Sequence, residues 1–141
     1  MREDSQADDS SSEQDPSRPS QPARRRILII EDSLDTATSF AQVFEILGYE
    51  ARIACDGHSG IERAREMLPD AILCDIGLPD IDGHEVARTL RSDPRLSHTL
   101  LIALTGYVQH RDREKALEAG FAYHVAKPVS IETLLRLLPR P

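Results

Sequence analysis

The chain has 141 residues, of which 40% are hydrophobic, and a formal net charge of -7 at pH 7. This length suits one domain with its own core and is short for two. The acidic balance argues against general binding to nucleic acid or anionic membranes, because basic surfaces bind both. The sequence has neither an apolar run near the roughly 20 residues that cross a bilayer nor a signal-peptide core. We therefore expect a cytoplasmic protein without nucleic-acid or membrane partners.

The first 26 residues form a polar segment of Ser, Asp, Gln, Pro, Glu and Arg with few apolar side chains. Such a segment buries too little apolar area to offset the entropy lost on ordering. We predict a disordered tail over residues 1–26, a folded domain over 27–138 and a short C-terminal end over 139–141. The arginines at 24–26 are interpreted as a solvated positive flank of the first strand.

From residue 27 onward, short apolar runs alternate with amphipathic segments. The runs have strand length and several are rich in β-branched residues. They predict five strands, at 27–30, 51–54, 71–74, 100–104 and 122–126. The segments that follow them predict five helices, at 33–47, 58–67, 83–91, 107–119 and 130–138. Gly48 suits the position after the end of the first helix, and Ser130 suits the N-cap of the last.

A repeat of strand and helix with right-handed crossovers gives a parallel sheet that helices cover on both faces. In such sheets, ligands bind at the carboxyl ends of the strands, where the strand order reverses. Two cysteines, Cys55 and Cys74, fall at the ends of the second and third strands. If the first strand lies between those two, the thiols are about 10 Å apart, which is too far for a disulfide. We expect two small buried thiols.

Polar side chains follow four of the five apolar runs. Glu31 and Asp32 follow the first run, Asp75 the third, Thr105 the fourth and Lys127 the fifth. If the strand order is 2-1-3-4-5, these groups converge on one pocket. Three neighbouring carboxylates repel one another, and Mg²⁺ is the natural compensation in an open pocket. With the lysine and the hydroxyl added, the set could receive a phosphoryl group beside a nucleophilic carboxylate.

The segments ILIIEDS, AILCDIGLPDIDG, LIALTGY and AYHVAKPVS stand at strand ends in this order. The ordered set resembles the receiver domain of two-component response regulators, over about residues 27–138, and is closest in character to receivers of hybrid sensor kinases. The resemblance implies a flavodoxin-like α/β fold of three layers, with a doubly wound five-stranded parallel sheet in the order 2-1-3-4-5. It also implies a signalling domain, not an enzyme, that takes a phosphoryl group from a histidine kinase or a phosphotransfer protein. That self-catalysed reaction depends on Mg²⁺.

The resemblance assigns roles to individual residues. Asp75 matches the aspartate that accepts the phosphoryl group, while Glu31 and Asp32 match the acidic pair that binds Mg²⁺. The backbone carbonyl of Gly77 matches the remaining protein ligand of the metal. Thr105 matches the switch hydroxyl that contacts the phosphoryl group.

Four further positions follow from the same resemblance. Lys127 matches the lysine that pairs with the phosphoryl group, and Pro128 suits the family's cis bond after that lysine. Gly106 lets the backbone approach the phosphoryl oxygens. His124 stands at the aromatic switch position, where Tyr or Phe is more usual, so Thr105 and His124 are the expected switch pair. A downstream protein target is expected on the fourth helix, fifth strand and fifth helix.

Two other classes of function stay open. A receiver-like interaction module that is never phosphorylated would be expected to lack an acid, the threonine or the lysine, and all are present. An aspartyl-phosphate phosphatase of the haloacid dehalogenase type would carry Asp-x-Asp-x-Thr after the first strand, where this chain has IIEDSLD. Because no helix-turn-helix follows the last predicted helix, we expect a single-domain regulator without DNA-binding output.

Overall fold

The computed structural model describes residues 24–106 and 110–141. Its strands are β1 (Arg26–Ile30), β2 (Glu50–Ala54), β3 (Ala71–Asp75), β4 (Leu100–Thr105) and β5 (Tyr123–Ala126). Its helices are α1 (Leu34–Ile46), α2 (Gly57–Met67), α3 (Gly83–Arg91), the short 3₁₀ helix η1 (Pro94–Leu96), α4 (His110–Ala119) and α5 (Ile131–Leu137). Each predicted strand differs from the observed one by a single residue at one end. The predicted start of the fourth helix, at 107–109, lies outside the described residues, and η1 was not predicted.

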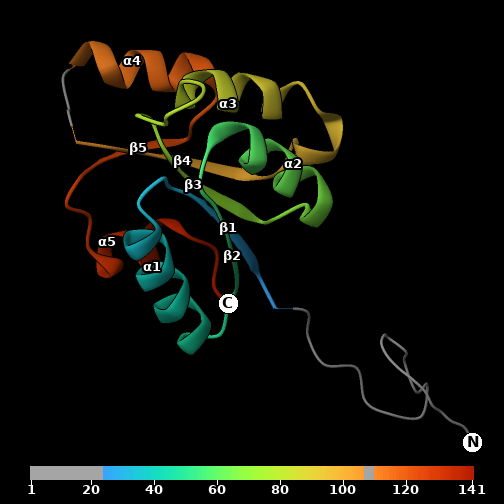
Figure 1. The fold of residues 1–141 in the computed structure, drawn as a ribbon, viewed down its shortest axis with the longest axis vertical. Helices are drawn as coiled ribbons and strands as arrows, with labels where there is room; N and C mark the ends of the chain where they lie inside the picture. Colours follow the sequence, from blue (N-terminus) through green and yellow to red (C-terminus); the bar gives the residue numbers. More distant parts are fainter. Residues whose placement is uncertain (1–23, 107–109) are drawn as a thin grey trace, which may run out of the picture.

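The strands form a five-stranded sheet in the order β2-β1-β3-β4-β5, in which every neighbouring pair is parallel. The strand order reverses between β1 and β3, so the carboxyl ends of these two strands meet at the switch point. Helices α1 and α5 cover one face of the sheet, and α2, α3 and α4 cover the other (Figure 1). The predicted three-layer, doubly wound fold is confirmed.

The side chains of β1 show how the two cores divide. Leu28 and Ile30 belong to the core under α2, α3 and α4, whereas Ile27 and Ile29 belong to the core under α1 and α5. All four are fully buried, and each such side chain contributes roughly 1.5–3 kcal/mol of hydrophobic free energy. Burial on both faces thus explains why this strand is apolar throughout.

Within the described ranges, no helix is long and apolar enough to cross a membrane.

Local signals set the helix ends that position the site. Ser33 caps α1 by accepting a hydrogen bond from the Thr36 amide, and Ser130 caps α5 in the same way. Gly48 follows α1 with a positive φ of 105°, a conformation that favours glycine. The predicted cap and stop residues are therefore confirmed.

The arginines before β1 are more than a solvated flank. Arg24 pairs with Glu45 of α1 at 2.7 Å, and Arg25 lies 3.6 Å from Asp70. Arg26 is the first residue of β1, and its backbone N–H donates to the Asp70 carboxylate at 2.8 Å. The sequence interpretation missed these contacts because their acidic partners lie far along the chain.

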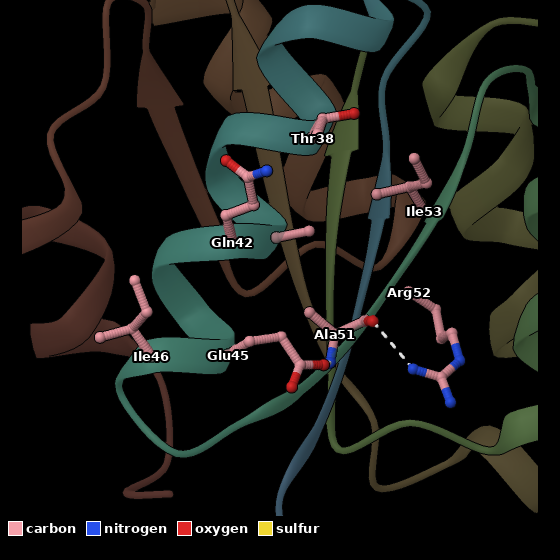
Figure 2. Close-up of a pocket in the computed structure, with 8 residues that line it drawn as sticks. Thr38, Gln42, Glu45, Ile46, Ala51, Arg52 and Ile53 are labelled. Carbon is pink, nitrogen blue, oxygen red and sulfur yellow. Dashed lines mark hydrogen bonds between the residues drawn. The ribbon is translucent and has the colours of Figure 1, made fainter.

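The outer edge of β2 is partly closed by side chains. The backbone N–H of Ala51 donates to Glu45 Oε2 at 2.8 Å, and the Ala51 carbonyl accepts from Arg52 Nη1 at 3.1 Å (Figure 2). Beside this edge lies a shallow pocket between α1 and β2, next to Ile46, whose side chain is 84% exposed. The pocket is lined by Thr38, Ala41, Gln42, Glu45, Ile46, Ala51, Arg52 and Ile53.

Both cysteines are free thiols, as the sequence predicts, but only one is buried. Burial raises the pKa of Cys74, on the central strand β3. Cys55 is exposed, so the prediction of a buried thiol is wrong there. It lies one residue beyond the end of the edge strand β2, where the sheet stops shielding side chains.

Candidate functional site

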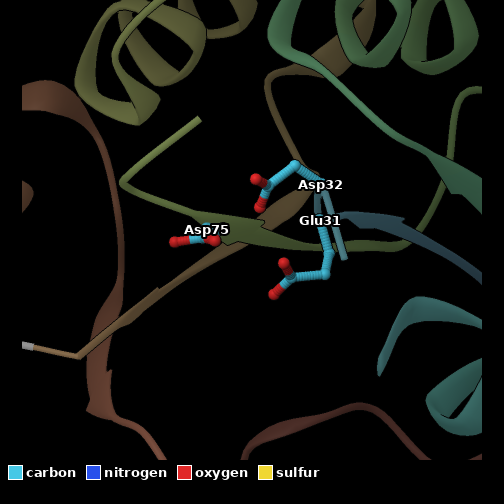
Figure 3. A group of neighbouring side chains, drawn as sticks. All are labelled: Glu31, Asp32 and Asp75. Carbon is cyan, nitrogen blue, oxygen red and sulfur yellow. The ribbon is translucent and has the colours of Figure 1, made fainter. Parts of the chain in front are cut away.

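The carboxyl ends of β1 and β3 bring three acids together. Asp75 is the last residue of β3, and Glu31 and Asp32 directly follow β1, with which β3 pairs. One carboxylate oxygen from each lies within 4.8 Å of the others (Figure 3). Glu31 and Asp75 are buried, with exposed fractions of 2% and 7%, whereas Asp32 is exposed. The cluster is therefore open to solvent on the Asp32 side, and its oxygen ligands suit a hard divalent cation such as Mg²⁺.

Lys127 supplies positive charge to the buried part of this cluster. Its Nζ lies 2.9 Å from Glu31 Oε1 and 3.0 Å from Asp75 Oδ2. Burial alone would lower the pKa of Lys127, but the hydrogen bonds to these two carboxylates outweigh it and raise the pKa. The Lys127 backbone N–H donates to the Thr105 carbonyl at 2.7 Å, and the bond to Pro128 is cis, as expected.

Backbone amides orient the two buried carboxylates. Asp75 Oδ1 accepts from the Gly77 N–H at 3.0 Å, and Glu31 Oε2 accepts from the Ser33 N–H at 3.0 Å. Each carboxylate therefore accepts a hydrogen bond from a backbone amide through one oxygen and from Lys127 through the other. Such charge-assisted bonds fix the direction of both groups.

Gly83 is a residue that the sequence analysis did not connect to the site. A Cβ at Gly83 would lie 2.7 Å from the Asp75 carbonyl oxygen and 2.7 Å from Ile76 Cα. Real Cβ atoms do not approach backbone so closely, so only glycine allows α3 to begin directly behind Asp75. The sequence signal was a glycine in the first position of a helix, after the N-cap Asp82.

The predicted switch residues share one face of the sheet. In the β4–β5 register, Thr105 pairs with Ala126 and Ala103 pairs with His124, and paired residues point to the same face. Thr105 is buried, with 9% exposed, and ends the strand next to Asp75. His124 Nδ1 is buried and has no hydrogen-bond partner within the described part of the chain. Their role as a switch stays a prediction.

Three charged or polar groups influence His124. Burial lowers its pKa, Asp112 opposes this, and Arg113 and His84 lower it further. His84 belongs to α3, where its Nδ1 lies 2.8 Å from Asp82 and its Nε2 is buried without a partner among the described residues. The imidazole of His124 therefore sits in surroundings that disfavour its protonation.

The remaining predicted residues are glycines in loops at the same edge. Gly77 is an exposed residue two positions after Asp75, and Gly106 directly follows β4. A Cβ at Gly106 would meet no atom of the described residues within 4 Å. Its contact with phosphoryl oxygens, and the metal contact of the Gly77 carbonyl, stay predictions.

A parallel sheet in this strand order, with acids and a lysine at its carboxyl edge, is the architecture of a receiver domain. Comparison with known families agrees, because residues 27–138 match the response regulator receiver domain. The chain therefore belongs to the response regulator receiver family, whose members act in two-component signalling.

Individual relatives match over most of their length. The polar-differentiation response regulator DivK of Brucella anthropi is 32% identical over 114 residues, which are 81% of this chain and 93% of DivK. The receiver domain of the sensor histidine kinase PA1611 of Pseudomonas aeruginosa is 33% identical, with a TM-score of 0.74 over 82% of this chain and 94% of that one. That structure holds a magnesium ion in its active-site cleft.

The chemotaxis protein CheY4 of Vibrio cholerae has the same fold. It superposes with a TM-score of 0.78 at 24% identity, covering 82% of this chain and 96% of CheY4. The predicted membership of the receiver family and the predicted fold are confirmed.

Proposed function

We propose that Asp75 accepts a phosphoryl group from the phosphohistidine of a histidine kinase or a phosphotransfer protein, in a reaction that depends on Mg²⁺. The observation that carries this proposal is the position of Asp75. Its carboxylate is held 3.0 Å from Lys127 Nζ and lies within 4.8 Å of the oxygens of Glu31 and Asp32. We expect this phosphoryl transfer to take place in the cytoplasm.

The transfer requires the dianionic phosphoryl group to enter a site that already holds three carboxylates. Mg²⁺ would be held by Glu31, Asp32, Asp75 and the Gly77 carbonyl, and when bound it offsets this negative charge. These residues fit a hard cation because every ligand is an oxygen and one side of the cluster is open.

The protein groups then have separate roles in the transfer. An Asp75 carboxylate oxygen attacks the phosphorus atom and forms the O–P bond, while the P–N bond to the donor imidazole breaks and its electron pair returns to nitrogen. The Lys127 ammonium compensates charge on the phosphoryl oxygens, and the Thr105 hydroxyl donates a hydrogen bond to one of them. The Gly106 backbone leaves room for these oxygens to approach.

Mass spectrometry of the intact protein tests the assignment of the acceptor. We expect acetyl phosphate with Mg²⁺ to add one phosphoryl group to the wild type and none to Asp75→Asn, and chelation of Mg²⁺ by EDTA to abolish the reaction. Asp82→Asn is a matched control, because Asp82 lies in the same loop and caps α3. Equal phosphorylation of Asp75→Asn and the wild type would refute the assignment.

The phosphorylated state is proposed to be recognised on the surface of α4, β5 and α5 by a downstream protein. Leu117 of α4 and Tyr123 of β5 are exposed apolar side chains on this surface, with 61% and 42% exposed. A hydrogen bond from Thr105 to the phosphoryl group would draw the Thr105 side chain toward Asp75. His124 lies on the same face of the sheet, paired with Ala103 two residues before Thr105.

Beryllofluoride, which mimics a phosphoryl group, allows this switch to be followed by NMR. We expect its addition to shift amide signals of α4 and β5 in the wild type, and these shifts to shrink in Thr105→Ala and His124→Ala. Identical shifts in all three proteins would show that neither side chain transmits the signal.

A further inference from the structure

The loop between β3 and α3, residues 76–82, begins and ends on fixed backbone. The Ile76 N–H donates to the Leu104 carbonyl of β4 at 3.0 Å, and the Gly83 N–H donates to the Ile76 carbonyl at 3.0 Å. These bonds close the base of the loop directly behind the acid cluster. The base alone leaves the exposed tip, around Asp80, without support.

The tip is fastened to the N-terminus of α2 by one carboxylate. Asp80 Oδ1 accepts from the Gly57 N–H at 2.7 Å. Asp80 Oδ2 accepts from the His58 N–H at 2.8 Å and lies 2.6 Å from the His58 ring Nδ1. A helix N-terminus has amide donors without helical partners, and an anion there is further stabilised by the helix dipole.

The pKa of Asp80 reflects the same contacts. Partial burial opposes ionisation, but the backbone N–H groups of His58, Gly57 and Ile81 and the His58 ring outweigh it and lower the pKa. Asp80 is therefore ionised near neutral pH and fully able to accept these bonds.

Apolar packing joins the same two segments. A Cβ at Gly57 would lie 2.3 Å from Ile81 Cγ1, so Ile81 sits directly against the start of α2. Ile81, with Ile76 and Leu78, also packs on the core under α2, α3 and α4. The loop tip therefore has both a polar and an apolar anchor.

Gly77 lies between the base and the tip, in the three-residue stretch 77–79. It is exposed and has no side chain that could be packed into place. Its N–H donates to Asp75 Oδ1 at 3.0 Å, but its carbonyl belongs to the peptide that joins it to Leu78. The direction of this carbonyl therefore depends on how the residues after Gly77 are held, and Asp80 is one of the residues that hold them.

We propose that Asp80 is a positioning residue for the cation site: by fastening the loop tip to α2, it holds the Gly77 carbonyl where it can act as a metal ligand. This inference rests on the proposed function, because that function supplies the cation. Asp80 is not a member of the acid cluster, because its two oxygens accept from the amides of α2, and it would act on the cation through the loop backbone. The sequence shows an acid at position 80 but does not reveal its contact with the start of α2.

Calorimetric titration with Mg²⁺ alone tests the effect on the metal without any phosphoryl donor. We expect Asp80→Ala to weaken Mg²⁺ binding several-fold relative to the wild type. Asp80→Asn should recover part of the loss, because its amide keeps one oxygen that can accept from one of the two N–H groups. Equal affinities of Asp80→Ala and the wild type would overturn the proposal.

The Mg²⁺ dependence of phosphorylation by acetyl phosphate gives a second readout. We expect Asp80→Ala to raise the Mg²⁺ concentration for half-maximal rate several-fold while the maximal rate at saturating Mg²⁺ stays within about twofold of the wild type. A fall in the maximal rate with no change in the half-maximal concentration would contradict a positioning role.

Asp56→Ala is the matched control for loss of a helix cap. Asp56 is the N-cap of α2 and accepts from the Ser59 N–H at 2.8 Å, but it belongs to the segment before α2 and not to the loop. We expect this variant to lose thermal stability while its Mg²⁺ affinity stays that of the wild type. If Asp56→Ala weakens Mg²⁺ binding as much as Asp80→Ala, the effect belongs to α2 stability, and the proposal is wrong.

The outcomes separate this inference from the proposed function. If the wild type binds Mg²⁺ but is not phosphorylated, the proposed function fails. The Mg²⁺ affinities of the wild type and Asp80→Ala then still decide the role of Asp80. If the wild type binds no Mg²⁺, both fail. If the wild type is phosphorylated and Asp80→Ala binds Mg²⁺ equally well, only the positioning role fails.

Discussion

Lys127 Nζ lies 3.0 Å from Asp75 Oδ2, so the lysine that follows β5 and the carboxylate that ends β3 form an ion pair. The same ammonium lies 2.9 Å from Glu31 Oε1. A divalent cation in the acid cluster would bind the same carboxylates. Lys127 and the metal ion would therefore compete for the carboxylates of Glu31 and Asp75, although the positive charge of each favours binding of a phosphoryl group.

Replacing Lys127 by methionine separates these two effects. We expect Lys127→Met to bind Mg²⁺ more tightly, because the competing positive charge is gone, and to be phosphorylated by acetyl phosphate about tenfold or more slowly, a loss of about 1.4 kcal/mol in transition-state stabilisation. Calorimetry gives the affinity, and the mass of the intact protein over time gives the rate. Lys115→Met, at an exposed position of α4, is the control and should change neither quantity.

Two glycines near Asp75 should respond differently to alanine. Gly83→Ala places a methyl group 2.7 Å from backbone atoms of Asp75 and Ile76, so we expect the free energy of unfolding to fall by about 1–3 kcal/mol. The methyl group of Gly106→Ala meets no atom of the described residues within 4 Å, so this variant should keep nearly the same stability while phosphorylation slows. Urea denaturation and acetyl phosphate kinetics measure the two effects. Equal stability losses in both variants would contradict this account.

Stability should depend on pH through His124. Its pKa is lowered in the fold, whereas the unfolded chain has a histidine pKa of about 6.5. As pH falls below that value, the unfolded state takes up the proton first, so the free energy of unfolding decreases. Urea denaturation between about pH 7.5 and pH 5.5 should therefore show a smaller decrease for His124→Gln than for the wild type. Parallel curves for the two proteins would show that His124 titrates alike in both states.

The residues before Arg24 are proposed to be dispensable for phosphorylation, because the whole site is assembled from residues 31–127. Removing residues 1–23 should change the melting temperature by less than about 2 °C and leave the phosphorylation rate unchanged.

Removing residues 1–26 gives the contrasting truncation. It deletes the Arg24 pair with Glu45 and the first residue of β1, so we expect a loss of about 1–3 kcal/mol in stability. A large effect of the shorter truncation would show that the tail docks on the domain.

Much of the fold followed from the sequence because the central strands β1, β3 and β4 are buried on both faces and therefore form apolar runs. The run at 71–74 is an example, because all four of its residues are buried. The site followed because parallel strands end at a common edge, so Glu31, Asp75 and Lys127 meet although up to 96 residues separate them.

Other features could not be predicted, because they depend on distances between segments that the sequence does not specify. Asp80 is an ordinary loop acid until the start of α2 is found 2.7 Å away. Gly83 resembles any glycine at a turn until the backbone of Asp75 is placed behind it. Cysteine is usually a buried residue type, but Cys55 is exposed because it lies beyond the end of the edge strand β2.

The closed edge of β2 bears on how copies of this domain behave at high concentration. An edge strand with free amide and carbonyl groups is a template on which another chain can add a strand. Glu45 and Arg52 occupy both backbone groups of Ala51, the second residue of β2. A second chain that pairs with β2 at this position would have to displace both side chains, so growth of the sheet from one molecule into the next is disfavoured there.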